Sequence, residues 1–214
     1  MKLVSSRFFV IVLVILISIV MSLWQVNFSM VLLTNFIVAF TGLMLPTVYI
    51  TLREKDISRI EKFLMKQKRN PNFMLVHALA NKNDKDVEEA IHKLLRKHRQ
   101  RHKQALYKTL YALYKEEILT AKQGIEWIRP LPYKHYYKSI VFIEEGNIKK
   151  ATQLIEQISI PWMKSALLSE IERKKGNSEE ALQLAKRALN QVNGLQKYVL
   201  YKTYQREFPQ MFSL

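Results

Sequence analysis

The stretch Gly146-Asn-Ile-Lys-Lys-Ala151 returns as Gly176-Asn-Ser-Glu-Glu-Ala181, 30 residues further along the chain. Counting back from Ala151 by the same interval leads to Ala121, and a step of 31 residues then leads to Ala90. Around all four alanines, the residues four positions after and ten and fourteen positions before are apolar or aromatic. Because residues four apart share one face of a helix, each unit is predicted to be a pair of helices that cross at the alanine.

Several such units are needed to make a core, because one helix pair cannot bury its own apolar stripe. The breaks between the helices fall at Pro and Gly-Asn positions, which end helices through a lost donor or a left-handed turn. No segment shows the apolar/polar alternation of a strand. The predicted fold class is all-α, with an α-solenoid of roughly four helix pairs over residues 72–214; an irregular helical bundle is the alternative.

The Gly-x-x-x-x-Ala element at 146–151 and 176–181 resembles the start of the second helix in tetratricopeptide-like repeats. The resemblance implies an α-solenoid that binds a protein partner on its concave face. The two earlier units depart from this pattern, because Lys85 and Glu116 stand at the glycine position. The spacing is also near 30 residues, whereas the family usually has about 34.

The N-terminal part of the chain is strongly apolar. Residues 8–24 and 30–52 form uncharged stretches of 17 and 23 residues, and about 20 apolar residues suffice for a helix to cross a bilayer. They predict a transmembrane hairpin over residues 1–52, whose helices pack together at Asn35 and Gly42. A cleaved signal peptide is the alternative for the first stretch, although it lacks a convincing small-x-small cleavage site.

Basic residues flank this hairpin on one side only. Excess Lys and Arg mark the cytoplasmic side of a membrane protein, so the sequence predicts a multi-pass protein of the cell membrane with both termini in the cytoplasm. Residues 53–71 are expected to form a juxtamembrane helix and linker that docks on the first repeat or lies against the bilayer. The flanking basic residues are Lys2, Arg7, Arg53, Lys55, Arg59 and Lys62.

The chain contains no cysteine, which excludes disulfides, thiol nucleophiles and cysteine zinc sites. It also lacks the usual catalytic and phosphate-binding motifs. His98 and His102 are four residues apart on one predicted helix, but their cationic neighbours disfavour a metal ion. We therefore expect no enzyme activity, no catalytic residues, no metal and no cofactor.

A basic segment, residues 93–103, holds six cationic side chains and no acidic one. It is a solvated helix end and loop, a face for anionic lipid head groups, or a face that binds an acidic partner. Nucleic acid is not expected, because the motifs of known nucleic-acid-binding modules are missing. The members of this candidate face are Lys93, Arg96, Lys97, Arg99, Arg101 and Lys103.

Two tyrosines, Tyr114 and Tyr136, lie outside the predicted core positions and are candidates for lining a groove. Repeat solenoids bind extended peptides or helices on their concave face. The sequence therefore suggests a membrane-anchored cytoplasmic scaffold or adaptor that binds a protein partner of unknown identity. The alternative is a basic helical domain that binds anionic lipid head groups or nucleic acid at the membrane.

Overall fold

The computed structural model describes the backbone of residues 2–212 and the side chains of residues 8–212. All regular structure within this range is helical, with twelve α-helices and one short 3-10 helix. The all-α prediction is confirmed. The chain divides into two compact units, Met1–Glu54 and Lys55–Leu214.

The first unit contains α1 (Lys2–Leu23) and α2 (Phe28–Leu52), which pack against each other. The amide Nδ2 of Asn35 donates a hydrogen bond of 2.6 Å to Ser18 Oγ. At Gly42, an added Cβ would lie only 2.6 Å from Cγ2 of Val10, so the absence of a side chain permits the close approach. The helices thus meet at the two positions that the sequence singles out, Asn35 and Gly42.

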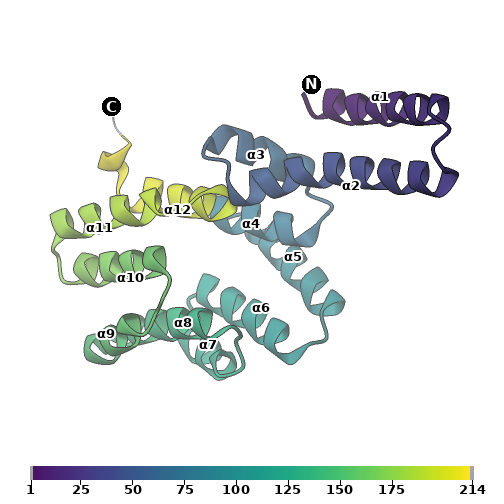
Figure 1. Cartoon of the computed structure of the whole chain (residues 1–214). Coiled ribbons are helices and arrows are strands. Elements are labelled where there is room, and N and C mark those ends of the chain that lie inside the picture. The colour runs from purple at the N-terminus through teal and green to yellow at the C-terminus, as the bar shows by residue number, and fades with distance from the viewer. Residues whose placement is uncertain (1, 213–214) are drawn as a thin grey trace. The chain divides into compact units, whose positions relative to one another are not determined.

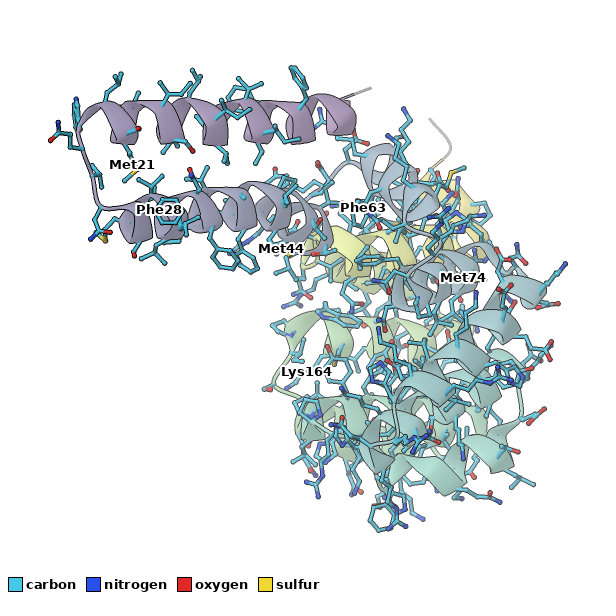
Figure 2. The ribbon with its side chains drawn as sticks, turned by 90° about the vertical axis from the view of Figure 1, so that its right-hand side faces the viewer. Met21, Phe28, Met44, Phe63, Met74 and Lys164 are labelled. Atoms are coloured by element: carbon cyan, nitrogen blue, oxygen red, sulfur yellow. The ribbon has the colours of Figure 1, made fainter. Side chains whose placement is uncertain are left out.

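Within the described residues, α2 is the one helix that is long and apolar enough to cross a membrane. Its 25 residues rise about 37 Å, compared with a hydrocarbon core of about 30 Å. No residue of α2 is buried, and apolar side chains stand out around it, including the labelled Phe28 and Met44 (Figure 2). The apolar part of α1, Phe8–Leu23, is shorter than α2. The length and composition of α2 are consistent with a membrane span or a signal sequence.

The second unit is built largely from helices that pack in sequential pairs, α4 with α5, α6 with α7, α8 with α9 and α10 with α11 (Figure 1). A short 3-10 helix, Pro209–Met211, follows the last α-helix. The α-helices are α3 (Ile57–Lys66), α4 (Pro71–Asn81), α5 (Asp84–Lys97), α6 (Arg101–Tyr114), α7 (Ile118–Ile125), α8 (Leu131–Glu144), α9 (Ile148–Glu156), α10 (Pro161–Lys174), α11 (Ser178–Asn190) and α12 (Gly194–Glu207).

The four register alanines all lie in the core of this unit. Each has an exposed fraction of 0%. Twelve residues before an alanine, a small side chain is also buried, and in the last pair Ser169 Oγ donates a hydrogen bond of 2.7 Å to the carbonyl of Ala181. Small residues on both helices bring the backbones close together at the crossing. The alanines are Ala90, Ala121, Ala151 and Ala181, and the small residues are Ala78, Thr109, Ser139 and Ser169.

The turns between paired helices share one backbone geometry. Gly146 and Gly176 have φ values of 74° and 85°, in the left-handed region that glycine adopts without a Cβ penalty. Glu116 occupies the same position with φ 61°. In the first pair the left-handed residue is Lys82, with φ 51°, three residues before the Lys85 that the register indicates. The first helix pair, α4 with α5, therefore departs from the 30-residue spacing at its turn.

The basic segment is not one helix. The prediction that His98 and His102 lie on the same helix is therefore wrong. Helix α5 ends at Lys97 and α6 begins at Arg101. The side chain of Gln104 donates hydrogen bonds to the carbonyls of Leu95 (2.8 Å) and His98 (2.7 Å), which satisfies backbone groups that the helix end leaves free. His98 therefore lies after α5, whereas His102 belongs to α6.

The last helix returns to the start of the unit, where α12 packs on both α3 and α4 (Figure 1). The fully buried Tyr198 accepts a hydrogen bond from Asn81 Nδ2 (2.8 Å) and donates one to Glu61 (2.9 Å). Arg206 adds a bond of 2.6 Å to the carbonyl of Ala80. The helix pairs thus form a run whose end is joined to its beginning, and α3 belongs to that junction through its buried residues Ile60, Phe63 and Leu64.

Candidate functional site

Each of the two tyrosines proposed to line a groove lies in the wall of a cavity. Tyr114, at the end of α6, lines a cavity of about 310 Å³ together with residues of the α4–α5 and α6–α7 turns. Tyr136, in the second turn of α8, lines a cavity of about 280 Å³. We call these the Tyr114 cavity and the Tyr136 cavity. The Tyr114 cavity is lined by Lys82, Asp84, Tyr114, Lys115 and Glu116.

In the Tyr114 cavity the tyrosine hydroxyl is already engaged. It donates a hydrogen bond of 2.5 Å to Asp84 Oδ1. Burial and this carboxylate raise the pKa of Tyr114 to about 12, because both disfavour the phenolate. The left-handed residues Lys82 and Glu116 form part of the wall, so this cavity lies between two neighbouring turns.

The Tyr136 cavity is formed by one face each of α8, α10 and α12. Its apolar walls come from Ile140, Ala166 and Leu200, and its aromatic walls from Tyr136 and Tyr204. The Tyr136 ring is held by an edge contact with Tyr137 and a tilted contact with Trp162, with ring centroids 5.4 and 5.6 Å away. Burial and the nearby charges of Glu207 and Glu170 raise the pKa of Tyr136 to about 12.

Three carboxylates and one guanidinium also line the Tyr136 cavity. Glu170 accepts two hydrogen bonds from Arg173, of 2.6 and 2.9 Å, and Glu144 pairs with Lys174 at 2.9 Å. Glu207 is solvent-accessible, yet the protein atoms around it and the charge of Glu170 raise the pKa of its carboxyl. Surrounding cations oppose this shift without cancelling it.

One hydroxyl in this cavity is buried without a partner. Tyr204 is only 4% exposed, and its Oη forms no hydrogen bond within the described part of the chain. Burial raises the pKa of Tyr204, and the charges of Glu207 and Glu170 add to the effect. Buried polar groups are nearly always paired, so an unpaired hydroxyl at this position is unusual.

The end of α12 lines the Tyr136 cavity through Thr203, Tyr204 and Glu207. The charge of Arg206 acts on Tyr114, where it lowers the pKa against the larger raising effects. The charge of Lys82, from the wall of the Tyr114 cavity, acts in turn on Glu207 of the Tyr136 cavity. We call the surface around the Tyr114 and Tyr136 cavities the tyrosine face.

The six basic residues lie on three consecutive elements, the end of α5, the connection and the start of α6. All are exposed except the half-buried Lys103. Lys93 pairs with Glu89 at 2.6 Å, and the guanidinium of Arg101 lies over the Trp127 ring, 3.1 Å from its centroid. Arg96 and Lys97 occupy the last turn of α5, where cations stabilise the helix end.

Trp127 is a site residue that sequence reasoning missed. It is 46% exposed and comes two residues after the end of α7, outside the repeat-core positions. Its contact with Arg101 joins the basic segment to the α7–α8 connection. A tryptophan shortly after a helix and before Arg129-Pro130 was the available signal, but its pairing with Arg101 depends on the folded structure.

No group of three or more histidine, aspartate or glutamate side chains among the described residues could hold a metal ion. Burial and the charges of Lys103 and Lys97 lower the pKa of His98.

Comparison of the chain with protein-family models, with curated proteins and with solved structures gives no match. The tyrosine face and the basic segment are the two candidate binding surfaces of the second unit.

Proposed function

We propose that this chain is a membrane-anchored cytoplasmic scaffold that binds a protein partner through the tyrosine face. The supporting observation is that Tyr114 and Tyr136 each line a cavity. Aromatic side chains in partly desolvated pockets are the usual energetic anchors of protein interfaces. The proposed role is non-catalytic.

A tetratricopeptide-like α-solenoid is the architecture that we propose for the second unit. The sequential helix pairs, the buried alanines at each crossing and the left-handed turns at Gly146 and Gly176 support it. The return of α12 to α3 and α4 would hold the solenoid closed. A closed frame presents its lining residues in fixed positions, which reduces the ordering cost of binding.

We propose that α1 and α2 together anchor this unit in the cell membrane as a two-span hairpin. The packing of Asn35 on Ser18 and of Gly42 on Val10 supports a helix pair, since small and polar residues are the usual contacts between helices in lipid. The basic residues flanking both outer ends favour a cytoplasmic location for the termini. The scaffold would then hold its partner at the inner membrane surface.

The proposal is tested by binding measurements on the full chain in detergent. Affinity capture from solubilised membranes identifies the partner, and its affinity is then measured for Tyr114→Ala and Tyr136→Ala. We expect each variant to weaken binding by about tenfold or more, as for interface anchors. The control is Leu119→Ala, which removes a side chain that is 78% exposed on α7. Unchanged affinity in both tyrosine variants would exclude the tyrosine face.

A second candidate function, binding of anionic lipid head groups, is favoured by the exposed Trp127 beneath Arg101. Tryptophan and arginine both suit the membrane–water interface. A variant with Arg96, Lys97, Arg99 and Arg101 changed to Gln separates the two candidates. If lipid is the ligand, the variant loses vesicle binding and the wild type shows a steep salt dependence. If the tyrosine face binds the partner, the variant retains partner binding.

A further inference from the structure

We propose that the Tyr136 cavity binds one basic side chain, a lysine or arginine, of an extended segment of the partner. This inference rests on the proposed function and adds the chemistry of the group that is recognised. The cavity joins aromatic walls, Tyr136 and Tyr204, to the carboxylate of Glu207. Rings and carboxylates together are the groups that bind an ammonium or guanidinium.

The charge of the cavity opposes that of the chain around it. The whole chain carries a formal net charge of +16, whereas the three carboxylates of the cavity, Glu144, Glu170 and Glu207, are paired with only two cations, Lys174 and Arg173. A carboxylate without a direct ion pair on a strongly basic chain favours a cationic ligand group.

Glu207 is the carboxylate left for this ligand. Arg173 occupies both oxygens of Glu170, and Lys174 pairs with Glu144. In the part of the chain that the structure describes, Glu207 forms no ion pair within 4.0 Å. A cation placed beside Glu207 would offset the partial burial that now disfavours its charged form.

The unpaired hydroxyl of Tyr204 supplies the second contact. Its Oη is buried in the wall of the cavity and lacks a partner among the described residues. Tyr136, Tyr204 and Glu207 all line this one cavity, and the charge of Glu207 acts on both tyrosine hydroxyls. A lysine ammonium has three donors and no acceptor. It can therefore donate to Glu207 while its methylene stem lies along the tyrosine rings, and a rotation of the Tyr204 side chain that exposes its hydroxyl adds the second contact.

The size of the cavity fits a single side chain. Pockets for drug-sized ligands span about 300–1,000 Å³, and this cavity of about 280 Å³ falls just below that range. The apolar lining by Ile140, Ala166 and Leu200 suits the stem of a long basic residue, since lysine and arginine bury their methylenes on apolar surface.

The test uses the full chain in detergent and two labelled nine-residue peptides of glycine and alanine. One peptide carries a central lysine, and the other carries norleucine, which has the same stem without the ammonium. We expect the lysine peptide to bind about tenfold more tightly, the ratio that one charge-assisted contact supplies. Equal affinities, or no binding of the lysine peptide at about 1 mM, would overturn the inference.

Two variants locate the contact. Glu207→Gln should abolish the preference for lysine over norleucine, and Tyr204→Phe should reduce it by about threefold while leaving the ring in place. The matched control is Glu156→Gln, at an exposed position at the end of α9, which should leave the preference unchanged. Circular dichroism checks that each variant is folded. A preference that survives Glu207→Gln would contradict the assignment.

The outcome is separable from that of the proposed function. If partner binding needs Tyr114 and Tyr136 but the peptides show no preference for lysine, the scaffold stands and the basic ligand group is refuted. If the lysine preference depends on Glu207 but the captured partner ignores both tyrosine substitutions, the cavity site stands and the proposed partner interface is refuted.

Discussion

Replacing Ala181 with leucine should destabilise the second unit, because this alanine lies at the crossing of α10 and α11. Its exposed fraction is 0%, and its carbonyl accepts a hydrogen bond of 2.7 Å from the hydroxyl of Ser169. Leucine adds three carbon atoms where the helices are in contact. The helices can accommodate them only by moving apart, which also lengthens the Ser169 hydrogen bond.

The magnitude follows from these two effects. Overpacking of a close-packed core costs about 1–3 kcal/mol, and the lost hydrogen bond adds about 1 kcal/mol. We therefore expect a loss of about 3 kcal/mol in the free energy of unfolding. For a unit of 160 residues, about 2–4 °C per kcal/mol gives a decrease in Tm of about 6–12 °C.

The assay is thermal unfolding of the full chain in detergent, followed by circular dichroism. Lys186→Leu is the matched control, since it places the same side chain at an exposed position of the same helix. Ala151→Leu repeats the test at the previous crossing, where Ser139 is also fully buried. If Ala181→Leu and Lys186→Leu unfold at the same temperature, the helices do not cross at the register alanines and the repeat model fails.

Glu116→Gly should raise Tm by about 1–4 °C, since glycine removes the strain of φ 61° at some entropic cost; a decrease would argue against the left-handed turn. Tyr198→Phe should cost about 1–3 kcal/mol, measured by urea unfolding, because Asn81 and Glu61 lose a common partner; an unchanged midpoint would mean that α12 is not fixed through this hydroxyl. Hydrogen bonds from Lys134 and Lys138 lower the pKa of Glu126 to about 2, so the stabilisation by this carboxylate is complete above about pH 4.5 and is lost as the pH falls toward 2. Over this pH range, the Tm of Glu126→Gln should therefore fall less than the Tm of the wild type. Parallel curves of Tm against pH for the two proteins would exclude the ion pair. Reporter fusions after residue 214 and at Asn27 should locate the C-terminus in the cytoplasm and the α1–α2 connection outside, and an exterior C-terminus would contradict the scaffold proposal.

The core of the second unit could be predicted because its signal is local and periodic. Alanines at a spacing of 30 or 31 residues, with apolar residues at fixed offsets, identify the buried face of each pair. The turns at Gly146 and Gly176 were readable because glycine is the residue that favours φ above zero. The turn at Lys82 was not, because a lysine carries no such signal and adopts the left-handed conformation through its place between α4 and α5.

Other features depend on contacts that are distant in sequence. The break between α5 and α6 contains neither Pro nor Gly, and the side chain of Gln104 caps the end of α5 from the following helix. The return of α12 to α3 requires Tyr198 to meet Glu61, 137 residues earlier in the chain. In the candidate site, the sequence selected Tyr136 but could not reveal Tyr204 or Glu207, because these residues reach the cavity from α12 only after the run has closed.

Photo-crosslinking in cells tests most directly whether the tyrosine face binds the partner. A photoreactive phenylalanine analogue replaces Tyr136 in one variant, Arg99 of the basic segment in a second, and the exposed Leu119 in a third. The scaffold proposal predicts a discrete adduct with a single protein from position 136 and none from positions 99 or 119. A protein adduct from position 99, with none from position 136, would contradict it and assign recognition to the basic segment.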